Sequence, residues 1–412
     1  MKKRRLGFAL STILSVTLAL GACSSSESTN GKSDEPLQIW AMGTEGQKLE
    51  DFLKDFEKES GIDVDVLAIP WGEAHDKLLT AVASGDGPDV LQIGNTWVSE
   101  FAEAGTFLDL TDRLDDYPNL SQDNFFESTT ATTVYEDKVY AVPYIIDTRL
   151  MFYRTDLLAE VGYPNGTETW EETVDAATKL AARGSGQYGI HISQNSHHIP
   201  MMMAWEHGWE YIIDKGAQNF EDPKFKAAIE LYNGFFKDGL AQLEQGKDTI
   251  QGFSDGTYPM FIDGPYMVNQ IKEQAPEIEG KWNVKVMPKV DNHNSMAGGS
   301  HFSVFHNTDR VEDSLEFINY MADPETQVAW YKEDFTLPTT KSAWEDPALA
   351  DDPIMSVFGD QIEMTQPFPV FPEYEKIAQE LLKTLEKINK GNEDIDQALS
   401  DYRDEVTSIL KE

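Results

Sequence analysis

Only one cysteine, Cys23, occurs in the sequence, and basic residues are scarce. A disulfide within the chain needs two cysteines, so stability must come from the packing of apolar side chains. The 33 lysines and arginines stand against 72 acidic residues, which gives a formal net charge of −39. Because a nucleic-acid-binding protein needs a basic surface, we expect no nucleic-acid partner.

Several catalytic and cofactor motifs are also missing. The chain has no nucleophile elbow, no phosphate-binding loop and no metalloprotease motif. Residues 184–189 read GSGQYG, but a helix-like segment precedes them and a strand-like segment follows, the reverse of the order in a dinucleotide-binding site. Of the clustered histidines His191, His197, His198 and His207, the last two lack short helical ligand spacing, and no cysteine joins them. We therefore expect neither a cofactor nor a metal site.

The first 22 residues have the composition of an export signal. A basic start, residues 2–5, precedes the apolar run 6–20, which is too short to span a membrane. The sequence Leu-Gly-Ala-Cys at 20–23 resembles the bacterial lipobox, which implies that Cys23 becomes the lipidated first residue; the alternative is an ordinary secretory signal. The serine-rich stretch 24–36 follows as a flexible tether. We expect a palmitate-bearing lipoprotein anchored to the outer face of the cell membrane.

Strand-like and helix-like segments alternate in the first part of the chain. Residues 37–40, 62–69 and 90–93 have the composition of strands, and 49–56 and 78–82 carry apolar residues at helical spacing. This alternation predicts an α/β fold with a largely parallel sheet. The length favours two or three domains, or one large two-lobed protein.

Polar side chains follow two of these strands. Thr44 and Glu45 come after the first, and Asn95, Thr96 and Trp97 come after the third. The carboxyl ends of parallel strands share one edge of a sheet, where open α/β sheets bind ligands. An indole beside hydrogen-bonding groups suits a sugar. The alternatives, which the sequence leaves open, are that Trp97 begins the next helix as a core residue and that Glu45 is a charge favoured by a helix N-terminus.

The second half of the chain repeats this pattern. Asp147 ends a strand-like run, and Tyr266 follows the strand 259–262 and the sequence Asp-Gly-Pro. Gly299 and Ser300 belong to a close-approach segment that leads into another strand. Trp209 either faces a cleft or packs in a core, and the sequence does not separate the two.

The order of these parts resembles the extracellular solute-binding proteins of ABC sugar importers, of the maltose-binding-protein type. The segments that carry the resemblance are 37–40, 56–64, 85–89, 144–158, 169–172 and 262–266. The resemblance implies a periplasmic-binding-protein-like α/β fold, with two lobes and a hinged cleft between them. It implies a monomer that is not an enzyme, captures a small carbohydrate (a di- or oligosaccharide) and delivers it to membrane permease subunits.

The resemblance also implies lobe boundaries and roles for single residues. Lobe 1 is expected to comprise 37–146 and 300–340, and lobe 2 to comprise 147–299 and 341–412. Thr44 and Glu45 match the polar loop that binds sugar hydroxyls, and Asp147 matches a cleft carboxylate at the hinge. Tyr266 and Tyr374 match stacking aromatics. Thr96 and Trp97 stand where maltose binders have an acidic residue and an arginine, which leaves the particular sugar open.

Two other function classes remain possible at this point. An exported glycosidase also needs aromatics and carboxylates, and Glu45 with Asp147 would be its pair at about 5–9.5 Å. No stretch of the sequence suggests a glycosidase barrel. The other class is a binding protein for a polyol, a peptide or a metal.

Overall fold

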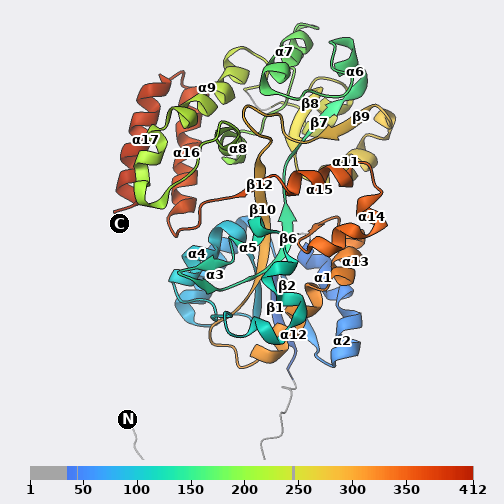
Figure 1. Cartoon of the computed structure of the whole chain (residues 1–412), viewed down its shortest axis with the longest axis vertical. Coiled ribbons are helices and arrows are strands. Elements are labelled where there is room, and N and C mark those ends of the chain that lie inside the picture. The colour runs from blue at the N-terminus through green and yellow to red at the C-terminus, as the bar shows by residue number, and fades with distance from the viewer. Residues whose placement is uncertain (1–34, 44, 244–245, 412) are drawn as a thin grey trace, which may run out of the picture. The chain divides into compact units, whose positions relative to one another are not determined.

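The computed structural model of the chain describes residues 35–43, 45–243 and 246–411. Residues 35–412 form one compact unit (Figure 1). The predicted export signal, Cys23 and Thr44 lie outside the described residues, as does the tether except for Glu35 and Pro36. Within the described ranges, no helix combines the length and the apolar composition that crossing a bilayer requires.

Lobe 1 is built on a mixed sheet of seven strands, in the order β11-β6-β10-β3-β1-β2 with β12 paired to β10. The strands are β1 (Leu37–Met42), β2 (Val64–Ile69), β3 (Val90–Gly94), β6 (Val142–Asp147), β10 (Ser295–Val304), β11 (Leu337–Pro338) and β12 (Thr365–Pro367). The predicted parallel pairing holds for β1 with β2 and β3. It fails further along the sheet, because β10 runs antiparallel to both β3 and β6.

Helices pack around this sheet. They are α1 (Glu45–Phe52), α2 (Lys54–Ser60), α3 (Trp71–Ser84), α4 (Val98–Glu103), α5 (Glu127–Thr130), α12 (Val311–Met321) and α13 (Pro324–Asp334). The single helix predicted over 49–56 is in fact two, interrupted at Leu53. Gly61 ends α2 in the left-handed conformation, with φ of 68°, and its N–H donates to the carbonyl of Glu57. A small hairpin, β4 (Val134–Tyr135) and β5 (Lys138–Val139), completes the lobe.

Lobe 2 has an antiparallel sheet of three strands, with β7 (Leu150–Arg154) between β8 (Met260–Asp263) and β9 (Trp282–Lys285). Its helices are α6 (Thr155–Glu160), α7 (Trp170–Ala181), α8 (His198–Glu206), α9 (Pro223–Lys237), α10 (Thr249–Ser254), α11 (Tyr266–Gln274), α16 (Tyr374–Asn389) and α17 (Ile395–Ile409). Thr169 caps α7 as predicted and accepts from the backbone N–H of Glu172 at 3.2 Å. The strand predicted at 190–192 is only an isolated bridge between His191 and Phe261.

The chain passes between the lobes in three places. Thr148 and Arg149 join β6 to β7, and β10 runs from its pairing with β12 into the lobe 1 sheet (Figure 1). The third passage holds α14 (Pro347–Ala350) and α15 (Met355–Ile362). One buried apolar cluster spans these passages, since it includes Ile146 and Leu337 of lobe 1 together with Phe152 of lobe 2. The predicted lobe boundaries stay predictions.

Candidate ligand-binding site

A cavity of about 510 Å³ lies between the two lobes. Its wall combines three carboxylates and several aromatic rings with backbone from β6 and β10. The lining residues are Gly43, Glu45, Trp71, Ile145, Ile146, Asp147, Pro265, Tyr266, Gln270, Gly299, Ser300, Asp334, Phe335, Thr336 and Leu337. Of the described residues around α11, Pro265, Tyr266 and Gln270 line the cavity, whereas most of the other lining residues belong to lobe 1.

Parallel strands bring the lobe 1 residues together at one edge of the sheet. β1 and β2 pair in register, and Gly43 continues the pairing by donating its N–H to Ile69 at 2.8 Å. Trp71 begins α3 just beyond β2. Gly43 has φ of 63°, and a Cβ there would lie 2.4 Å from Oε2 of Glu45 and 2.8 Å from Nε1 of Trp71. Only glycine therefore leaves room for this carboxylate and this indole to converge.

The three carboxylates of the cavity wall differ in their partners. Asp334 pairs with Lys48 at 2.8 Å, and Asp147 pairs with Arg149 at 2.5 Å. Glu45 forms no salt bridge within the described part of the chain. Burial is the largest cause that raises the pKa of Glu45, and with the nearby charges of Asp334 and Asp147 it brings this pKa to about 7, against a backbone hydrogen bond and the charge of Lys48, which lower it. Near neutral pH the Glu45 carboxyl is therefore present in both forms and can donate or accept a hydrogen bond.

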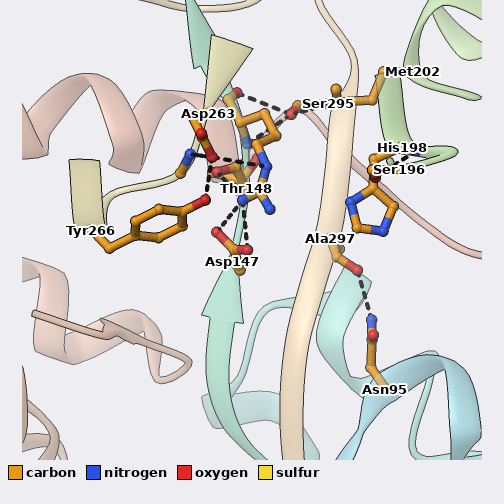
Figure 2. A network of polar contacts seen from close by, with 12 residues as sticks. Asn95, Asp147, Thr148, Ser196, His198, Met202, Asp263, Tyr266, Ser295 and Ala297 are labelled. Atoms are coloured by element: carbon orange, nitrogen blue, oxygen red, sulfur yellow. Dashed lines mark hydrogen bonds and ion pairs between the residues drawn. The ribbon is translucent and has the colours of Figure 1, made fainter. Parts of the chain in front are cut away.

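A polar network joins the end of β6 to the end of β8 and the start of α11. Nη1 of Arg149 donates to both carboxylate oxygens of Asp147, at 2.6 and 2.5 Å. The hydroxyl of Tyr266 donates to Asp263 (Figure 2). Tyr266 is 44% exposed, so much of its ring is open to a ligand.

Comparison with known proteins decides the family. Residues 51–357, about three quarters of the chain, match the bacterial extracellular solute-binding proteins. The chain belongs to this family. The predicted resemblance to solute-binding proteins of the maltose-binding-protein type is confirmed, and so is the two-lobed fold.

Two relatives illustrate how far the similarity extends along this solute-binding protein. The sugar-binding protein MalE of Xanthomonas citri has a similar structure, with a TM-score of 0.86 and 31% identity over 92% of this chain and 98% of that chain. The galactooligosaccharide-binding protein of Bacillus subtilis (strain 168) is 24% identical, over 96% of this chain and 95% of its own length.

Five of the predicted site residues line the cavity of the solute-binding protein: Glu45, Asp147, Tyr266, Gly299 and Ser300. Asn95, Thr96 and Trp97 form a short 3-10 helix beyond β3 and do not line it. Asn95 is buried and donates from Nδ2 to the carbonyl of Ala297 at 2.8 Å, which holds β10 in place. Trp97 contacts the lining residue Trp71 edge to face, but the predicted place of Asn95, Thr96 and Trp97 in the cavity wall itself needs correction.

Trp209 and Tyr374 lie elsewhere, so the predicted stacking position of Tyr374 needs correction, and Trp209, which the sequence left open between a cleft and a core, packs in a core. Trp209 is 1% exposed in the lobe 2 core, where it stacks on Phe220 and donates from Nε1 to the carbonyl of Asn219 at 2.9 Å. Tyr374 is buried at the start of α16, with its ring centroid 5.9 Å from that of Phe371. Both rings face the helices of lobe 2, and an aromatic in a helix or loop carries no local sign of which side it faces.

Several lining residues were missed in the sequence. Trp71 follows a strand and a proline, so it has the same pattern of a strand followed by an aromatic residue that indicated Trp97. The sequence could therefore have predicted Trp71 as a site residue. Asp334 and Phe335 end α13, and Phe335 adopts a left-handed φ of 63°. No periodicity marks them, because α13 meets α1 only in the folded chain, through contacts between segments far apart in the sequence.

The clustered histidines of lobe 2 do not form a metal site. Across residues 35–43, 45–243 and 246–411, no group of three or more His, Cys, Asp or Glu side chains could hold an ion. His197 and His198 pack against Phe368 instead, with ring centroids 5.3 and 5.1 Å from it. Burial lowers the pKa of His197 to about 4, so this side chain is neutral at physiological pH.

Proposed function

We propose that this solute-binding protein captures a di- or oligosaccharide in the cavity between its lobes and delivers it to the permease subunits of an ABC importer. The observation that carries the proposal is the combination of Trp71 and Tyr266, from opposite lobes, with the carboxylates of Glu45, Asp147 and Asp334. A pyranose ring has apolar faces that stack on aromatic rings and hydroxyls that donate to carboxylates. The cavity offers both kinds of contact.

The names of the relatives support a carbohydrate. Similar proteins are described as binding galactooligosaccharide, diacetylchitobiose, lactose and maltotriose. These ligands differ in sugar and linkage, so they support the chemical class and not one compound. A set of matched sugars is therefore the right first experiment.

The position of the aromatic rings supports a closing motion on binding. A sugar held between Trp71 of lobe 1 and Tyr266 of lobe 2 contacts both lobes at once. Contacts that form fully only when the lobes approach stabilise the closed form relative to the open one. Closure would then report to the permease that the protein is loaded.

The remaining parts of the proposal concern location and assembly. The family is extracellular, and we propose that a lipid on Cys23 anchors the protein to the outer face of the cell membrane. Cys23→Ser should move the protein from the membrane fraction to the supernatant, and retention in the membrane fraction would contradict the anchor. We also propose that the protein is a monomer, which light scattering tests. We further propose the lobe boundaries given above, which limited proteolysis tests.

The test of the sugar proposal is titration calorimetry, with tryptophan fluorescence, on the chain from Ser24 onward. The panel contains maltose, maltotriose, lactose, galactotriose and N,N′-diacetylchitobiose. Saturable binding of at least one sugar is expected, and the nine tryptophans should report closure.

Tyr266→Ala should weaken binding at least about tenfold. Leu79→Ala is the matched control, since Leu79 is 45% exposed but does not line the cavity. Binding of no sugar, with no thermal shift, would overturn the proposal.

A second measurement separates capture from hydrolysis. We propose that the protein is not an enzyme, so each sugar of the panel should be recovered intact after prolonged incubation. Chromatography of the products decides this. Release of smaller sugars that is abolished by both Glu45→Gln and Asp147→Asn would instead establish a glycosidase.

A further inference from the structure

Arg149 is a partly buried cation at the first passage between the lobes. It lies in the two-residue link between β6 and β7, and its side chain is 14% exposed. It does not line the cavity. Burying a guanidinium is costly unless carboxylates surround it, so its surroundings indicate what it does.

Two carboxylates from the ends of different strands face the guanidinium. Asp147, the last residue of β6, accepts from Nη1 at 2.5 and 2.6 Å. Asp263, the last residue of β8, has its Oδ1 3.9 Å from Nε of Arg149. The same oxygen of Asp263 accepts from the hydroxyl of Tyr266 and from the N–H of Gly264, the latter at 2.8 Å. Arg149 therefore connects Asp147 to Tyr266, and both of these residues line the cavity (Figure 2).

The convergence of these groups depends on Gly264. A Cβ at this position would lie 2.6 Å from Nη1 of Arg149, 2.8 Å from Oδ1 of Asp147 and 2.9 Å from Cε1 of Tyr266. Any other residue would displace at least one of the three groups. The absence of a side chain at Gly264 thus leaves space for the guanidinium of Arg149 beside Asp147 and Asp263.

The backbone of Arg149 is anchored to the second passage between the lobes. Its N–H donates to Oγ of Ser295 at 3.1 Å, and its carbonyl accepts from the same hydroxyl at 3.0 Å. Ser295 is fully buried at the start of β10. Arg149 is therefore fixed relative to both connecting strands before any ligand arrives.

We propose that Arg149 is a positioning residue of the ligand site, which fixes Asp147 directly and Tyr266 through Asp263. Without a cation between them, the two carboxylates would repel each other and neither cavity residue would keep its place. The planar guanidinium can face two carboxylates from different atoms, whereas a lysine ammonium is a single point charge. This arrangement sets the separation between a hydrogen-bond acceptor at the end of β6 and a stacking ring at the start of α11.

One experiment tests the position of Tyr266 without a ligand. The chain from Ser24 is labelled with 13C-tyrosine, and the Tyr266 ring signal is the one of 15 that Tyr266→Phe removes. Arg149→Lys and Arg149→Met should shift or broaden this signal while the signals of buried tyrosines stay in place. Lys48→Met is the matched control, because Lys48 pairs with another cavity carboxylate, Asp334, and should leave the Tyr266 signal unchanged. An unchanged Tyr266 signal in both Arg149 variants would overturn the proposal.

A second experiment rests on the proposed function and uses the sugar panel given above. Arg149→Met should weaken binding at least about tenfold, Arg149→Lys less, and Tyr266→Phe about threefold. The double variant Arg149→Met with Tyr266→Phe should bind no more weakly than Arg149→Met alone, because both act on the same ring. Fully additive losses would overturn the route through Asp263.

The two experiments fail in distinguishable ways. If the wild-type protein binds no sugar, the proposed function fails, while the tyrosine spectra still decide whether Arg149 positions Tyr266. If Arg149→Met does not fold, Arg149→Lys retains the positive charge, and both the Tyr266 signal and the sugar affinity are measured with that variant. Loss of stability without any change in the Tyr266 signal would leave Arg149 a purely structural residue and overturn the proposal.

Discussion

The indole rings of Trp71 and Trp97 meet edge to face, with centroids 5.9 Å apart and planes inclined at 66°. Trp71 lines the cavity, whereas Trp97 does not and also contacts the ring of His75, with centroids 5.1 Å apart. Each tryptophan follows a strand of the parallel part of the lobe 1 sheet. The two strand ends therefore bring their indole rings into contact, and of the two only Trp71 lines the cavity.

Trp71→Ala should weaken sugar binding at least about tenfold, because it removes a stacking surface that is 37% exposed. The partial exposure implies only a small loss of stability. Trp97→Phe keeps an aromatic ring behind Trp71 and should change the affinity less than about threefold. Titration calorimetry with the sugar panel measures both, and a larger loss in Trp97→Phe than in Trp71→Ala would reverse the two roles.

Tyr374→Phe should leave sugar affinity unchanged and should not destabilise the protein. The hydroxyl of Tyr374 is buried and has no hydrogen-bond partner among the described residues, so its removal deletes an uncompensated polar group. We expect a stability change of about zero to 1 kcal/mol in favour of the variant. Urea unfolding measures the stability and titration calorimetry measures the sugar affinity. A clear loss of affinity would show that Tyr374 belongs to the ligand site after all.

Glu45→Gln should stabilise the protein at alkaline pH and have little effect in acid. The pKa of Glu45 rises from 4.5 to about 7 on folding, so the folded chain holds an extra proton between these values. The stability that this proton contributes is fully present below pH 4.5 and is lost as the pH rises through 7. The shift corresponds to at most about 3 kcal/mol.

Urea unfolding of wild type and Glu45→Gln at pH 4.5 and 8.5 measures this difference. Subtracting the wild-type curve at each pH removes the contribution of other titrating groups. Glu50→Gln, on the exposed face of the same helix, is the matched control. An identical effect of Glu45→Gln at the two pH values would contradict the assigned cause.

Gly299→Ala should destabilise the protein by about 3 kcal/mol or more. Gly299 has φ of 117°, and a Cβ there would lie 2.0 Å from the carbonyl oxygen of Ile145 on the neighbouring strand β6. Gly298→Ala is the matched control, because its closest neighbour at 2.7 Å is the mobile methyl end of Met296. Thermal unfolding of both variants tests the close approach, and equal stability would contradict it.

The strands and most helices could be predicted because local patterns specify them. The apolar run at β3 and the strand, glycine-proline and aromatic sequence around Tyr266 each identify an element by short-range order. The break at Leu53 was not predicted, since the same apolar face continues across it. The antiparallel direction of β10 was also not predicted, because a strand's sequence does not specify its partners.

By itself, the sequence determined the fold class, the family and the strand ends at which Glu45, Asp147 and Tyr266 lie. These follow from periodicity, from glycine and proline positions and from the order of segments, all of which are local properties of the chain. Only the tertiary structure decided that Trp71 lines the cavity, that Tyr374 is core, and that Arg149 joins Asp147 to Asp263. The physical reason is that the side a ring faces, and the partner a buried charge finds, depend on segments far away in the sequence.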